Sequence, residues 1–302
     1  MSRIEQALGR AANRADDPLD LNRVADSEVF DSPWSFDQAA VVPIRPSATP
    51  RSFDDRAAVP EPFPQEQPRF TDFSPVWKPK LVVADESNPI LVEQFRALAA
   101  TLHQAQVDHG IKVVLLTSAE PGEGKSLTAV NLALTLSGSY GRRVLLMDAD
   151  LRRPSLDRIA QLPGERGLGE ALKAVEPQKV PLYHVSESLV IAPAGRPDAN
   201  PMSVVTSPRM QELISDARAR FDWVLIDAPP LGPIADATLL APLAEGVLLV
   251  VRAGRTHYTA VQKAVETLGR ERVMGVVLND ADAAEATAYG NYAYDYGTRE
   301  KE

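Results

Sequence analysis

The sequence predicts an α/β fold in which a parallel sheet is covered by helices on both faces. From about residue 81 onward, apolar runs of strand length alternate with segments of helical pattern. The runs are apolar at consecutive positions, as strands buried on both faces are, and strands separated by helices indicate parallel crossovers. The polar segments of chemical interest follow these runs, and ligands of such sheets bind at the carboxyl ends of the strands.

Six strands and four helices are predicted in this region. The strands are expected at 112–117, 143–148, 189–192, 223–227, 246–252 and 273–278. The helices are expected at 89–105, 125–137, 208–219 and 258–269. A chain of 302 residues that contains these elements can form one substantial domain with an appendage.

The first 80 residues have a different composition. They hold 11 of the 25 prolines, and their apolar residues follow neither a helical nor a strand period. We therefore predict a disordered, proline-rich region at 1–80, a folded domain at 81–280 and a flexible tail at 281–302. Within the first region, residues 2–12 have one apolar helical face, which is consistent with a short frayed helix or with a helix that docks on a partner or membrane surface.

Composition excludes several functional classes. The formal net charge of -9 argues against a sequence-independent grip on nucleic acid, which needs a basic face. The absence of cysteine excludes disulfides and thiolate metal sites, and the four histidines lack the spacing of a zinc site. The longest apolar runs, such as "VLLVV", are far short of the roughly 20 residues that cross a bilayer. A cytoplasmic location is the simplest expectation.

The segment "AEPGEGKS" at 119–126 fits a phosphate-binding loop, except that Ala119 stands where glycine is usual. Its two glycines let the backbone fold back so that successive N–H groups point inward, toward a phosphate. Lys125 is expected to reach the β- and γ-phosphates, and the Ser126 hydroxyl to ligate Mg²⁺. The predicted nucleotide-binding turn comprises Pro121, Gly122, Glu123, Gly124, Lys125, Ser126 and Leu127.

Three aspartates follow predicted strands and are candidate partners of this loop. Asp148 and Asp150 lie two residues apart in "VLLMDADLRRP", so in an extended segment both carboxylates would project the same way. Asp227, in "FDWVLIDAPP", is the last residue of the predicted strand at 223–227 and has the position of a Walker B aspartate. A solitary aspartate after a strand is usually a turn or helix cap, but three beside a phosphate loop indicate a metal-assisted site.

The combination of "SAEPGEGKS", "LLMDADLRRP" and "WVLIDAPPLGPIADA" resembles the bacterial tyrosine kinases that govern capsular and exopolysaccharide synthesis. The resemblance covers roughly residues 80–296 and implies a P-loop NTPase fold of the MinD/ParA type, with ATP and Mg²⁺ as ligands. It assigns Lys125 and Ser126 to phosphate and metal, and Asp227 to the outer shell of the metal. Asp148 and Asp150 together would hold the metal and orient or deprotonate the incoming tyrosine. Asp148 is favoured as the base and Asp150 as the metal ligand, but the resemblance leaves the division between them open. Arg152 and Arg153 would then neutralise charge at the transferred phosphoryl group or form a surface contact.

Four of the seven tyrosines lie close to the end of the chain, in "YGNYAYDYG". Their alternation could indicate an edge strand with one aromatic face. The glycine, alanine and aspartate content instead favours a mobile tail, and in the resembling kinases such a cluster is the autophosphorylation site. The four tail tyrosines are Tyr289, Tyr292, Tyr294 and Tyr296.

The resemblance also implies partners. The start "MSRIEQALGRA" resembles single-chain kinases that work with a separate membrane-spanning chain-length (co-polymerase) adaptor, which would recruit the protein to the inner face of the plasma membrane. A homo-oligomer and a cognate tyrosine phosphatase are expected as well. The family's oligomer-forming Glu-Arg-Arg motif is incomplete, since Glu93 and Arg96 are followed by Ala99.

Two alternative functions stay open at this level. A MinD/ParA-type ATPase switch would have the same fold without kinase activity, but such proteins usually place a lysine where this chain has Glu120. An idle scaffold that binds ATP without transferring phosphate is the other, and the complete set of phosphate-loop and aspartate residues argues against it.

Overall fold

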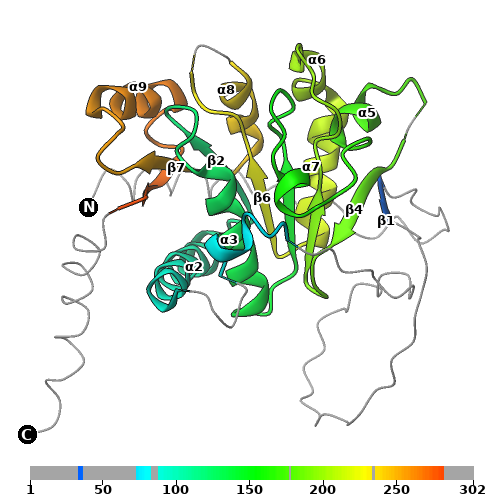
Figure 1. Ribbon diagram of the computed structural model, residues 1–302. Coiled ribbons are helices and arrows are strands. Elements are labelled where there is room, and N and C mark those ends of the chain that lie inside the picture. The colour runs from blue at the N-terminus through cyan, green and yellow to red at the C-terminus, as the bar shows by residue number, and fades with distance from the viewer. Residues whose placement is uncertain (1–32, 37–72, 83–87, 177, 233–234, 282–302) are drawn as a thin grey trace, which may run out of the picture.

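The computed structural model describes residues 33–36, 73–82, 88–176, 178–232 and 235–281 (Figure 1). Eight strands in these ranges form one sheet in the order β1-β4-β5-β3-β6-β2-β7-β8. All pairings are parallel except β4 with β5. The bounds are β1 Trp34–Phe36, β2 Val113–Ser118, β3 Val144–Asp148, β4 Val180–His184, β5 Leu189–Ala192, β6 Trp223–Asp227, β7 Gly246–Arg252 and β8 Val273–Asn279.

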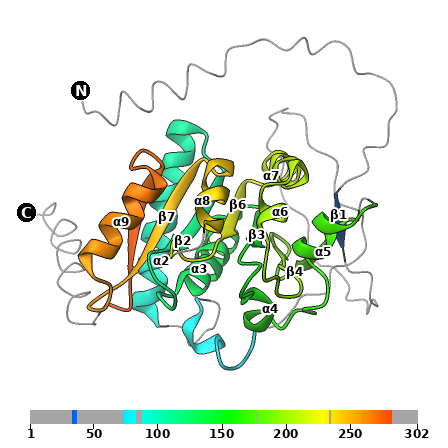
Figure 2. The same cartoon turned by 90° about the horizontal axis from the view of Figure 1, so that it is seen from above.

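Helices cover both faces of this sheet (Figures 1 and 2). Their bounds are η1 Lys78–Lys80, α2 Pro89–His109, α3 Lys125–Gly138, α4 Leu156–Ile159, α5 Leu168–Lys173, α6 Met202–Val205, α7 Pro208–Arg220, α8 Asp236–Leu240, η2 Ala241–Leu243 and α9 Tyr258–Leu268. In β2, Val113 and Leu115 pack into the core shared with α7 and α8, whereas Val114 and Leu116 pack into the core shared with α2 and α3. This alternation confirms the predicted sheet that is buried on both faces.

The predicted elements are all present, with small differences at their ends. Strands β5, β6 and β7 have the predicted bounds. Helix α2 runs four residues beyond the expected end, because it stops only at Gly110, whose φ of 68° is left-handed. Strand β4 was not predicted, because Pro181 interrupts its pattern. The proline is tolerated there because β5 pairs only with Tyr183 and His184 of this strand, and so does not pair with Pro181.

Two segments ahead of residue 81 belong to the folded domain, which differs from the expectation of disorder throughout 1–80. Trp34 in β1 is only 4% exposed, and Phe73 is only 6% exposed. Ser74 donates its N–H to the carbonyl of Ile159 at 2.9 Å, so the second segment is held by the backbone as well. Aromatic residues in a proline-rich stretch thus add to the core. The remaining residues of 1–80, including the predicted helix at 2–12, lie outside the described ranges.

The carboxyl ends of β2, β3, β6, β7 and β8 lie at one rim of the sheet, because these strands are parallel neighbours. The loop between β2 and α3 therefore meets the ends of β3, β6 and β8 there. None of the helices within the described residues is long and apolar enough to cross a membrane.

Candidate functional site

The predicted phosphate loop joins β2 to α3, and its shape depends on two glycines. Gly122 has a φ of 82° and Gly124 a φ of 90°, which is the left-handed region that residues with a Cβ atom rarely adopt. Helix α3 starts at Lys125, directly after the turn, so its free N–H groups and the positive end of its dipole face the loop. The loop has the local structure that phosphate binding requires.

Glu123 supports the loop from behind and does not face the pocket. Its side chain is 3% exposed. It accepts hydrogen bonds from the N–H of Glu120 at 2.7 Å and from the hydroxyl of Thr256. Asn279, at the end of β8, donates its side-chain amide to the carbonyl of Glu123 at 2.8 Å. The other six predicted loop residues line the pocket, so the side chain of Glu123 is the exception.

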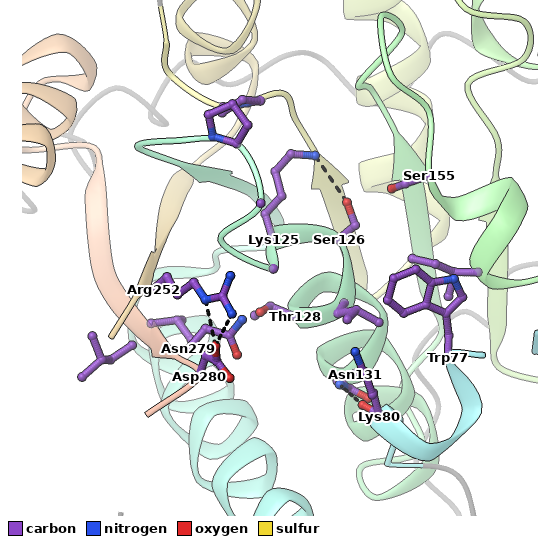
Figure 3. Close-up of a pocket in the computed structure, with 18 of the residues that line it drawn as sticks. Trp77, Lys80, Lys125, Ser126, Thr128, Asn131, Ser155, Arg252, Asn279 and Asp280 are labelled. Atoms are coloured by element: carbon purple, nitrogen blue, oxygen red, sulfur yellow. Dashed lines mark hydrogen bonds and ion pairs between the residues drawn. The ribbon is translucent and has the colours of Figure 1, made fainter. Parts of the chain in front are cut away.

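Lys125 lies between two aspartates (Figure 3 shows it beside Ser126). Its Nζ is 3.1 Å from Asp150 Oδ2 and 3.2 Å from Asp227 Oδ1. Burial lowers the pKa of Lys125, but the charges of Asp227, Asp150 and Asp148 outweigh burial, and the net pKa is well above the ordinary value. The lysine is therefore a permanent cation in this site, aimed at the place where the loop would hold phosphate.

Asp227 has the properties of a metal ligand. It is fully buried, and its Oδ2 has no hydrogen-bond partner among the described residues. Burial raises its pKa, and the charge of Lys125 opposes that shift. No three histidine or acidic side chains in the described ranges are grouped closely enough to hold a metal by themselves. The unpaired oxygen, with the Ser126 hydroxyl nearby, suits Mg²⁺, which typically takes one or two protein carboxylates and completes its shell with phosphate and water.

Asp148 and Asp150 do not project together, as an extended segment would have placed them. Strand β3 ends at Asp148, which is fully buried and pairs across the sheet with Asp227. Both carboxylate oxygens of Asp148 accept backbone N–H groups, from Asp150 at 3.1 Å and from Ser155 and Leu156 at 3.0 Å. Asp150, in the following turn, lines the pocket instead. Asp148 thus caps the turn that positions Asp150.

The protonation state of Asp148 is set by opposing effects. Burial and then the charge of Asp227 raise its pKa to about 7, whereas the backbone N–H groups of Leu156 and Ser155 lower it. A carboxyl group with this pKa could exchange a proton near neutral pH. The same N–H groups leave it little freedom to approach a substrate in this conformation.

The pocket at this rim encloses about 1390 Å³, more than the 300–1,000 Å³ of common small-molecule sites. One side is formed by the end of β8, where Asp280 accepts from Arg252 Nε at 2.8 Å. The other side is formed by Trp77 and Lys80, whose ammonium lies 5.3 Å from the indole centroid (Figure 3). The contribution of Trp77 and Lys80 to the pocket was not predicted, because the sequence around η1 is too short and too rich in proline to indicate packing.

The two arginines after Asp150 differ in environment. Arg152 Nε lies 2.5 Å from Asp236 Oδ2, a carboxylate that is 1% exposed, and the guanidinium also donates to the carbonyl of Ala199. Both arginines line the pocket, but Arg153 is exposed whereas Arg152 is partly buried. Of the two, Arg153 is the one whose side chain could meet a transferred phosphoryl group, whereas Arg152 is held by Asp236.

The motif on α2 is also resolved. Arg96 and Glu93 form an exposed pair at 2.5 Å within one turn of the helix. Ala99, which stands where the family has arginine, is fully buried against α3. The position therefore belongs to the core and cannot supply a surface contact. The four tail tyrosines lie outside the described residues.

Comparisons with known proteins agree with this geometry. Residues 110–292 match the ParA family, described as NUBPL iron-transfer P-loop NTPase. The tyrosine-protein kinase YwqD of Bacillus subtilis is 34% identical over 215 residues, covering 70% of this chain and 90% of YwqD. The succinoglycan biosynthesis transport protein ExoP of Rhizobium meliloti is 35% identical over 230 residues. This match covers 73% of this chain but only 29% of ExoP.

Solved structures give the same result. The kinase domain of the Escherichia coli tyrosine kinase ETK superposes with a TM-score of 0.62 at 26% identity, covering 73% of this chain and 87% of that one. The kinase domain of VpsO superposes with a TM-score of 0.57 at 32% identity, covering 64% and 96%. The region that matches the ParA family, residues 110–292, contains the phosphate loop and the ends of β3 and β6 described above.

Proposed function

The chain belongs to the ParA-type P-loop NTPases and, within them, to the bacterial tyrosine-protein kinases, and from this premise we propose that it transfers the γ-phosphoryl group of ATP to protein tyrosine. The observation that carries the proposal is the contact of Lys125 with Asp150 in addition to Asp227. The Walker B carboxylate is common to P-loop NTPases, and Asp150 places a second carboxylate in the lining of the pocket.

The chemistry is mainly positioning and charge neutralisation. The loop N–H groups and Lys125 would hold the β- and γ-phosphates, and Ser126, Asp150 and Asp227 would hold Mg²⁺. When bound, Mg²⁺ would neutralise negative charge on the phosphate oxygens. In-line transfer forms a bond between the tyrosine oxygen and the γ-phosphorus, breaks the bond to the β-phosphate oxygen, and releases the phenolic proton.

The phenolic proton needs an acceptor only as the new bond forms, because the phenol pKa is near 10. Asp148 as that base would have to release at least one of its three backbone N–H donors. Asp150 already faces the pocket, so it is the carboxylate that would orient the acceptor hydroxyl in this conformation. Asp148 then acts on the reaction through the position of Asp150.

The acceptors are the four tail tyrosines, and the activity would regulate exopolysaccharide or capsule polymerisation and export. YwqD, a tyrosine-protein kinase, supports the activity, and ExoP, a succinoglycan biosynthesis transport protein, supports the polysaccharide setting. The part of ExoP that this chain matches is under a third of its length. A separate membrane-spanning adaptor would act together with this chain. It would also recruit the protein to the inner face of the membrane, and a tyrosine phosphatase would reverse the modification.

The proposal is tested with Lys125→Met and the matched control Lys263→Met, a charge removal at an exposed position on α9. Protein incubated with ATP and Mg²⁺ is analysed for phosphotyrosine by mass spectrometry. We expect the first variant to lose about 10²–10³-fold in rate with an unchanged circular dichroism spectrum, and the control to keep its rate. Full activity of Lys125→Met would refute the assignment of the loop. ATP hydrolysis without phosphotyrosine in the unsubstituted protein would favour the ATPase switch.

A further inference from the structure

The three residues of β1 form a separate strand at the edge of the sheet. Figures 1 and 2 show β1 alongside β4, at the end of the sheet away from β8. The two strands are parallel, with Trp34, Ser35 and Phe36 opposite Val180, Pro181 and Leu182. The N–H of Val180 donates to the carbonyl of Pro33 at 2.7 Å. This is the geometry of an extended peptide added to an open strand edge.

The indole of Trp34 occupies a specific slot beside this edge. It is 4% exposed and packs into the same core as Val180 and Leu182. Its Nε1 donates to Asp216 Oδ2 on α7 at 2.6 Å. Asp216 is oriented by Arg220, whose Nε lies 2.7 Å from the same oxygen. An aromatic body in an apolar slot with its N–H on a carboxylate is how a tryptophan anchor is recognised.

Strand β4 depends on this neighbour. Its pairing with β5 involves only Tyr183 and His184, so within the described residues the first three residues of β4 pair with β1 alone. In the sequence, β1 is separated from the next described segment by the 36 residues of 37–72. Because 36 residues separate β1 from the next described segment, this three-residue strand is held in place by its own contacts with β4 and α7.

We propose that the β4 edge and the slot beside Asp216 form a peptide-binding site for an extended segment that contains one tryptophan, and that Pro33–Phe36 is its tethered ligand. Covalent attachment makes the binding intramolecular, so a free peptide of the same sequence competes at a disadvantage. The site attaches the N-terminal region to one edge of the kinase domain. It lies across β5, β3 and β6 from the phosphate loop, so its occupancy leaves the catalytic residues in place.

The test uses the full chain with Trp34→Ala, which empties the slot, and the labelled peptide FDSPWSFDQA, residues 30–39. Fluorescence anisotropy should show binding to this variant at least 10-fold tighter than to the unsubstituted protein. Trp77→Ala, which removes a tryptophan outside the slot, should bind the peptide as weakly as the unsubstituted protein. A peptide with alanine in place of the tryptophan should not bind to any of the three.

Hydrogen exchange at the Val180 amide gives an independent readout. Exchange should be faster in Trp34→Ala, slower again with saturating peptide, and also faster in Asp216→Ala, which removes the indole's acceptor. Equal peptide binding by the variant and the unsubstituted protein, or unchanged Val180 exchange in both variants, would overturn the proposal. Global unfolding of Trp34→Ala would do so too, because Trp34 would then be part of the core. Val180 protection that rises with protein concentration would mean that a second copy supplies the strand, and the tethered form would be wrong.

Discussion

Replacing either glycine of the phosphate loop by alanine compares two positions that have similar positive φ values and different surroundings. Gly122 and Gly124 have φ values of 82° and 90°. A Cβ atom at Gly122 would meet nothing within 4 Å, whereas one at Gly124 would lie 2.0 Å from Nδ2 of Asn279. Any difference between the two variants therefore measures the contact between the loop and the end of β8.

The magnitudes follow from these surroundings. Both variants lose about 1–2 kcal/mol of unfolding free energy, since a residue with a Cβ atom is strained in the left-handed region. Gly124→Ala must also displace the Asn279 amide, which breaks its 2.8 Å hydrogen bond to the Glu123 carbonyl. That adds about 1–2 kcal/mol for the lost bond and the group left unpaired. We expect about 1–2 kcal/mol for Gly122→Ala and about 2–4 kcal/mol for Gly124→Ala.

The assay is urea unfolding of the ligand-free protein, because alanine at either position could also block phosphate in the liganded state. Asn279→Ala and the double variant Gly124→Ala with Asn279→Ala complete a mutant cycle. The double variant should be more stable than the sum of the single changes by about 1 kcal/mol, since the clash is absent. Equal costs for the two glycine replacements, or an additive cycle, would refute the role given to Asn279.

Three further predictions concern the arginine, the buried carboxyl group and the tail. Arg152→Ala should lower the unfolding free energy by about 3 kcal/mol, because it leaves the buried Asp236 carboxylate unpaired. The double variant Arg152→Ala with Asp236→Ala should regain part of the lost stability. No loss of stability of Arg152→Ala in thermal or urea unfolding would contradict this role of the ion pair. In the folded protein, the pKa of Asp148 is raised from 3.8 to about 7, so the folded state binds more protons than the unfolded state between these pH values. The unfolding free energy of the unsubstituted protein, measured relative to that of Asp148→Asn, should therefore fall as the pH rises from about 4 to about 7. A difference that stays flat or rises would count against the raised pKa. Lys125→Met protein with an intact tail should be phosphorylated by active protein whose four tail tyrosines are phenylalanine; an unmodified tail, with self-labelling of the unsubstituted protein independent of concentration, would indicate transfer within one subunit.

Six of the eight described strands could be predicted because their signal is local. Runs such as "WVLID" and "GVLLVVR" are apolar on both faces and end at charged residues, so their bounds follow from the sequence alone. Strand β1 could not be predicted in this way. Three residues carry no period, and what fixes them is a contact of Trp34 with Asp216, 182 residues away in the chain. Pairing across such a separation has no local signature.

The site was predictable in its residue types and not in the direction of its side chains. Lys125 and Asp227 meet as the phosphate-loop pattern implies, because strand ends of a parallel sheet share one rim. Glu123 turns away from the pocket because the N–H of Glu120 and the Thr256 hydroxyl offer it buried partners. Asp148 caps the turn after β3 because three N–H groups there donate to its carboxylate. The directions of the Glu123 and Asp148 side chains thus depend on which hydrogen-bond donors the fold places beside them.

The destination of the γ-phosphate distinguishes a tyrosine kinase from an ATPase. Purified protein is incubated with γ-labelled ATP and Mg²⁺, and the label is divided between protein phosphotyrosine and inorganic phosphate, with the variant in which the four tail tyrosines are phenylalanine as a control. For a tyrosine kinase, we expect most of the early label on Tyr289, Tyr292, Tyr294 and Tyr296, and we expect this fraction to be lost in the control. Label that appears only as inorganic phosphate, at the same rate in both proteins, would refute the kinase activity and identify an ATPase.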